Sequence, residues 1–152
     1  MSALASGSSG IPPTLKKAFL VNFIWINLSE VFRYFVFIMP MIRKSFPELP
    51  GIAPMNLGIF SLWGLWDLIL IIATTGFVWL YQNQFGLTLK NSLSAGFLVW
   101  VAIFGILWLA LFNLNLATAS ILSIALPLSC LELLIAAWIV FRVRTGRRQV
   151  PE

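Results

Sequence analysis

Four long hydrophobic runs follow one another along the chain, near residues 18–41, 57–80, 92–112 and 117–141. Each run is long enough to cross about 30 Å of hydrocarbon as an α-helix that rises about 1.5 Å per residue. The segments between the runs are polar or rich in glycine and proline. The pattern therefore predicts an all-α integral membrane protein, a four-helix bundle formed as one domain by residues 17–141.

Three short segments connect the predicted spans. Residues 43–56 contain three prolines and a glycine, which predicts an ordered surface loop. Residues 82–91 are polar, and Gly86 is the expected pivot of a turn there. Residues 113–118 are so few that we expect the third and fourth spans to form an antiparallel hairpin.

Basic residues are shared unequally between the two ends of the predicted bundle. Both tails and the turn at 82–91 lie at one end and hold seven lysines and arginines, whereas the other end holds only Arg43 and Lys44. Cytoplasmic segments of membrane proteins carry such an excess. We therefore expect both termini to be cytoplasmic at an inner or plasma membrane, with residues 1–16 as a disordered tail and residues 142–152 as a basic tail.

The composition agrees with lipid as the solvent of most side chains. Of the 152 residues, 60% are hydrophobic and only 10% are charged, whereas a soluble domain carries about 25% charged residues. The net charge of +5 comes mostly from basic residues at the ends of the spans. That distribution favours membrane lipids as partners and argues against binding to nucleic acid.

The chain contains one cysteine, Cys130, and no histidine. A single thiol cannot form an internal disulfide or a dithiol redox pair. Without histidine, bis-histidine haem sites and histidine-based zinc sites are excluded. We therefore expect no cofactor and no metal ion.

Four ionisable residues lie deep inside the predicted spans. Glu30 and Arg33 lie near the centre of the first span and Asp67 near the centre of the second. Glu132 lies slightly cytoplasmic of the centre of the fourth span. A charged group at the centre of a membrane helix costs about 2.5–3.5 kcal/mol on translocon scales. We therefore expect these side chains to face one another or water, rather than lipid.

Uncharged side chains that can contact a ligand share the faces of these groups. Asn27 and Tyr34 lie on the same helical stripe as Glu30, and Trp63 precedes Asp67 by one turn on the same face. We expect the three carboxyls to lie at about one depth and to converge on one cavity. The candidate ligand- and proton-binding residues are Glu30, Arg33, Asp67, Glu132, Asn27, Tyr34 and Trp63.

This set of residues predicts a site for a small cationic or amphipathic ligand. One arginine cannot neutralise three carboxylates, so we expect at least one of Asp67 and Glu132 to be protonated when the cavity is empty. The ring of Trp63 beside a carboxylate attracts an organic cation, and Asn27 and Tyr34 are expected to hydrogen-bond the ligand. The main hypothesis is a protein that binds or transports such a ligand, coupled to protonation of a carboxyl.

Two other classes of function fit the same residues. The first is a lipid- or sterol-modifying membrane enzyme that uses buried carboxyls as acid and base, although no catalytic residue is assigned. The second is a non-catalytic accessory subunit whose buried charges meet a partner helix, in a homo-oligomer or with another membrane subunit. The sequence contains no GxGD, NDxxD or Walker motif, which removes several classes of membrane enzyme.

Overall fold

The structure is a computed structural model that describes residues 11–49, 51 and 56–146. Within these residues, four helical segments are long and apolar enough to cross a membrane, which confirms the predicted four-helix membrane bundle. The first consists of α1 (Pro13–Arg33), the π-helical stretch η1 (Tyr34–Ile38) and α2 (Met39–Ser45), and the second is α3 (Leu57–Phe85). The third consists of α4 (Leu89–Trp100), the π-helical stretch η2 (Val101–Gly105) and α5 (Ile106–Asn113), and the fourth is α6 (Ala119–Gly146).

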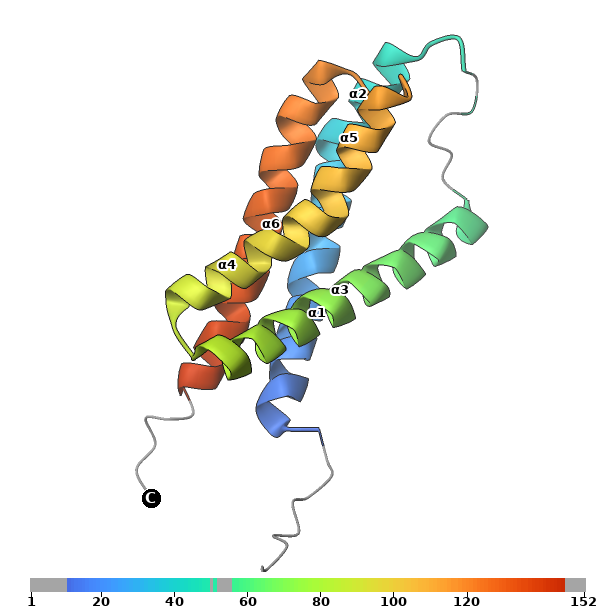
Figure 1. The fold of residues 1–152 in the computed structure, drawn as a ribbon. Helices are drawn as coiled ribbons and strands as arrows, with labels where there is room; N and C mark the ends of the chain where they lie inside the picture. Colours follow the sequence, from blue (N-terminus) through green and yellow to red (C-terminus); the bar gives the residue numbers. More distant parts are fainter. Residues whose placement is uncertain (1–10, 50, 52–55, 147–152) are drawn as a thin grey trace, which may run out of the picture.

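The helices extend past the boundaries that hydrophobicity indicated. The first begins at Pro13, because proline has no N–H to lose at the first helical position, and α6 continues to Gly146. Parts of both predicted tails are therefore helical. Residues 1–10 and 147–152 lie outside the described residues. The beginning of α1 and the end of α6 lie at the same end of the bundle (Figure 1). The cytoplasmic placement of that end stays a prediction.

Two residues with positive φ make the turns on either side of the third span. Gly86 has φ 95°, which confirms it as the pivot between α3 and α4. Asn115 has φ 57° between α5 and α6, a left-handed conformation that asparagine adopts more readily than most residues. Around it, the N–H of Leu116 donates to the carbonyl of Leu111 at 2.8 Å. The predicted hairpin of the third and fourth spans is therefore confirmed.

Small residues allow α4 and α6 to approach each other closely. Gly96 is buried, and a Cβ atom added to it would lie 2.7 Å from the Cβ of Ala137 and 2.9 Å from the carbonyl oxygen of Leu133. On α6, the face that carries Ala125, Ser129, Glu132 and Ala136 is buried throughout. Without a hydrophobic driving force between helices in lipid, such close backbone contact contributes much of the packing energy.

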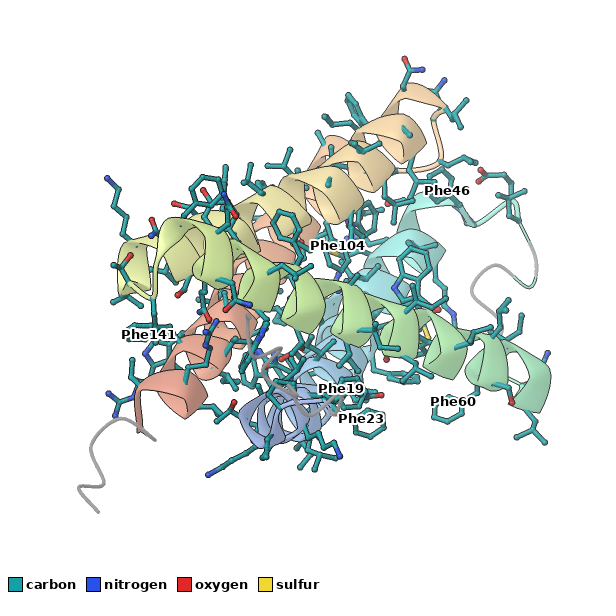
Figure 2. All side chains as sticks on the ribbon, turned by 60° about the horizontal axis from the view of Figure 1, so that its bottom comes forward. Phe19, Phe23, Phe46, Phe60, Phe104 and Phe141 are labelled. Atoms are coloured by element: carbon teal, nitrogen blue, oxygen red, sulfur yellow. The ribbon has the colours of Figure 1, made fainter. Side chains whose placement is uncertain are left out.

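The second span leaves the bundle over its first ten residues. The buried stripe of α3 begins at Asp67 and continues toward Gln82, whereas no residue from 57 to 66 is buried. Figure 1 shows α3 crossing the other helices at an angle, with its beginning far from α2 and α5. Phe60 points away from the bundle in Figure 2 and is 55% exposed. Asp67 therefore marks the point at which α3 joins the other helices.

Asn22 links three of the spans through its buried side chain. Its Nδ2 donates to Thr75 Oγ1 at 3.0 Å and to the carbonyl of Ala136 at 3.3 Å. Hydrogen bonds between membrane helices contribute about 0.6–2 kcal/mol. We expect Asn22→Ala to lower the free energy of unfolding by about 1 kcal/mol, measured by denaturation in mixed micelles. Asn27→Ala is the matched control and should leave stability unchanged, because among the residues described Asn27 Nδ2 donates only to the carbonyl of Phe23 in its own helix, at 2.8 Å.

Candidate functional site

Arg33 lies between two buried carboxyls that come from different helices. Its Nη2 donates to Oε1 of Glu30, which lies three residues earlier on the same helix face. Its Nε lies 3.6 Å from Glu132 Oε2 on α6, an ion pair slightly longer than a hydrogen bond. The guanidinium also lies 4.9 Å from the centre of the buried Phe104 ring, which is labelled in Figure 2. All three charged side chains are at least nine-tenths buried.

Asp67 extends this group to a third carboxyl. Its residue is 3% exposed, and the side chain of Trp63, one helical turn earlier, lies close enough to interact with its carboxyl. It lies close enough to Glu30 and Arg33 to interact with them electrostatically. Within the described residues, Asp67 Oδ1 has no hydrogen-bond partner. We call Glu30, Arg33, Asp67 and Glu132 the acid cluster.

The acid cluster has an excess of acidic groups over its single base. Three ionised carboxyls beside one guanidinium would leave two uncompensated negative charges in a buried place. Unpaired buried charge is strongly unfavourable, so the cluster either holds protons or takes up a cation. Among the residues described, no group of three histidine, cysteine or acidic side chains is placed to hold a metal ion. A proton on a carboxyl, or a cation beside it, each removes part of this excess of negative charge.

Two π-helical stretches hold aromatic rings beside the cluster. η1 begins at Tyr34, directly after Arg33, and the N–H of Met39 reaches back five residues to the carbonyl of Tyr34. Pro40 follows at once; because its ring would crowd the carbonyl four residues earlier, a widened turn relieves the contact. In the third span, η2 carries Phe104 against Arg33. Such stretches are frequent at functional sites.

A cleft of about 400 Å³ lies beside the cluster, between the first span, α3 and the third span. Glu30 and Arg33 supply its charged wall. Aromatic and aliphatic side chains line the rest: Tyr34, Ile38, Ile42, Ile59, Leu62, Trp63, Trp66, Phe104, Leu107 and Trp108. The rings of Tyr34 and Trp63 meet edge to face at 4.9 Å. The divergence of α3 opens this cleft, because no residue of α3 before Asp67 is buried, although the ring of Trp63 still contacts the first span.

A second, smaller cavity reaches the cluster from another direction. This crevice of about 160 Å³ lies between α1 and α6 and is lined in part by Arg33, Leu128 and Glu132. Arg33 lines both cavities, whereas Glu30 lines only the cleft and Glu132 only the crevice. The three carboxyls thus gather in one cluster, but they do not line one cavity as expected.

The remaining sequence candidates divide into two groups. Tyr34 and Trp63 line the cleft. Asn27 does not, because its side chain bonds to the backbone of its own helix.

Three aromatic residues beside the cluster carry contacts that hydrophobicity alone did not indicate. Trp25 Nε1 donates to the carbonyl of Glu132 at 3.0 Å, and Trp100 Nε1 donates to Ser129 Oγ at 3.1 Å. Trp108 lines the cleft, and no residue described accepts a hydrogen bond from its buried indole N–H. The sequence offers one signal for this region, Pro40, which marks the π-helical turn beside Tyr34.

Comparisons of the chain with models of protein families, with curated proteins and with solved structures find no match. The acid cluster and the two cavities that meet at Arg33 are the features of the molecule that bear on its function.

Proposed function

We propose that the protein binds a small cationic, amphipathic molecule in the cleft and carries it across the membrane in exchange for protons held by the acid cluster. The observation that carries this proposal is the imbalance of three buried carboxyls around one guanidinium, beside an aromatic cleft. A cation that enters the cleft supplies the missing positive charge. Protons and the cation then compete for the same carboxyls, which is the simplest form of coupled exchange.

The lining of the cleft supports an amphipathic ligand rather than a small inorganic ion. Its volume of about 400 Å³ lies within the range of about 300–1,000 Å³ that small-molecule sites occupy. Apart from Glu30 and Arg33, its walls are largely hydrophobic. The faces of Trp63 and Tyr34 attract an organic cation through their π-electrons. Leu62 and Trp66 are exposed at the edge of the cleft, so a ligand dissolved in lipid can reach it.

Each member of the site then has a distinct role. Glu30 and Arg33 set the local field, and Trp63 and Tyr34 contact the ligand, with the Tyr34 hydroxyl as a hydrogen-bonding group. Asp67 lies behind Trp63 with one carboxyl oxygen unpaired, so it attracts a cation held against that ring. Asp67 or Glu132 gives up the proton that the cation replaces.

Binding of tetraphenylphosphonium to the protein in lipid nanodiscs tests this proposal. We expect the wild type to bind the phosphonium and to reject tetraphenylborate, which has the same shape and the opposite charge. Binding should weaken as the pH falls, because protons compete for the carboxyls. Asp67→Asn should weaken binding about tenfold, a loss of about 1.4 kcal/mol, because it removes a negative charge beside the cation.

The control is Glu48→Gln, which removes an acid outside the cluster, in the segment after α2. It should leave the affinity for the phosphonium unchanged. Equal affinity for the phosphonium and the borate, or an Asp67→Asn variant that binds as tightly as the wild type, would overturn the proposal.

A further inference from the structure

Arg33 is the one charged side chain that borders both the cleft and the crevice within the described part of the chain. The two cavities contact different carboxyls, Glu30 on the side of the cleft and Glu132 on the side of the crevice. The guanidinium donates a hydrogen bond to Glu30 and stays 3.6 Å from Glu132. The cluster is therefore asymmetric, with its only base closer to one of two competing acids.

The carboxyl of Glu132 is buried and has unused bonding capacity. Its residue is 2% exposed, and neither Oε1 nor Oε2 has a hydrogen-bond partner among the residues that the structure describes. The Nε of Arg33 is likewise without a hydrogen bond there. A charge-assisted hydrogen bond between them is about 2.8 Å long, so a shift of less than about 1 Å would form it.

We propose that Arg33 couples the two cavities: a cation bound beside Glu30 moves the guanidinium toward Glu132, which then releases one proton into the crevice. This inference rests on the proposed function and names the acid and the route of its proton. The O–H bond of Glu132 breaks, its electron pair stays on the carboxylate oxygen, and the proton passes to water in the crevice. An ion pair between Arg33 and the new carboxylate of Glu132 takes the place of the broken O–H bond. One positive charge enters and one leaves, so the cluster keeps its net charge.

The surroundings of Glu132 favour this assignment over the other acids. The ionisable groups that face it are Glu30 and Arg33 from α1 and Asp67 from α3. The third span contributes none nearby, since its only ionisable residue is Lys90 at the beginning of α4. Glu30 already holds the guanidinium as its counter-ion. Asp67 does not line the crevice, so its proton has no comparable exit on that side.

Counting the protons released per phosphonium bound tests the inference. With saturating tetraphenylphosphonium in weakly buffered nanodiscs, we expect one proton from the wild type and from Glu48→Gln. Glu132→Gln should bind the phosphonium and release none. Asp67→Asn, although it binds more weakly, should still release one proton at saturation. Release that persists in Glu132→Gln and vanishes in Asp67→Asn would overturn the inference and leave the proposed function standing. A wild type that binds no phosphonium would overturn both.

Infrared difference spectra give a second readout. They use the wild type, so the result does not depend on whether a variant folds. Phosphonium binding should remove the carbonyl stretch of a protonated carboxyl. Carboxyl-¹³C labelling of glutamate should shift that band, because the acid is a glutamate. A band that shifts only with labelled aspartate would overturn the assignment to Glu132.

Discussion

Replacing Arg33 with methionine should lower the free energy of unfolding by about 3–5 kcal/mol, the usual cost of removing one partner from a buried ion pair. Methionine fills a similar volume but leaves the carboxyl of Glu30 buried with no counter-ion and removes the only base beside Glu132. Removing the guanidinium also ends its contact with the ring of Phe104. Denaturation in mixed micelles, followed by near-UV circular dichroism, measures the loss.

Arg142→Met is the matched control, because Arg142 is exposed near the end of α6 and lies 5.8 Å from the Trp138 ring. An exposed charge of this kind contributes less than about 1 kcal/mol. Adding Glu30→Gln and Glu132→Gln to Arg33→Met should restore most of the stability, since neutral amides need no counter-ion. An Arg33→Met variant as stable as Arg142→Met would mean that the cluster is not held together by its charges.

The fold was predictable because hydrocarbon imposes a simple rule on the chain. Every spanning segment must pair the N–H and C=O groups of its own backbone and present apolar side chains. Four apolar runs therefore give four helices. The pair of Glu30 and Arg33 was predictable for a similar local reason, because residues three apart share a helix face. Glu132 could be placed near them from its depth alone, with helical rise as the measure.

The cavities could not be predicted, because they depend on how α3 sits against the other spans. Apolar residues before Asp67 look alike in the sequence whether they face lipid or another helix, so the divergence of α3 leaves no trace in hydrophobicity. Phe104 is one of 13 phenylalanines, and only the fold places it against Arg33. For the same reason, the sequence could not show that Glu30 and Glu132 border different cavities.

Replacing Gly96 with leucine should lower the free energy of unfolding by about 3 kcal/mol, at the upper end of the usual cost of overpacking. Even a methyl group there would lie 2.9 Å from the backbone oxygen of Leu133, which cannot rotate away. The helices α4 and α6 must therefore move apart, and the loss is read from denaturation in mixed micelles. Gly64→Leu is the matched control, because no atom lies within 4 Å of an added Cβ at that position of α3; it should cost nothing.

The same substitution also tests whether the packing of α4 and α6 positions the acid cluster. Gly96, Trp100 and Phe104 lie four residues apart along one helical segment, so a shift at Gly96 moves both rings away from α6. The hydrogen bond from Trp100 to Ser129 and the contact of Phe104 with Arg33 should then weaken together. Phosphonium binding should therefore fall in Gly96→Leu and stay unchanged in Gly64→Leu. Full binding by a destabilised Gly96→Leu variant would show that the cluster keeps its geometry without this helix contact.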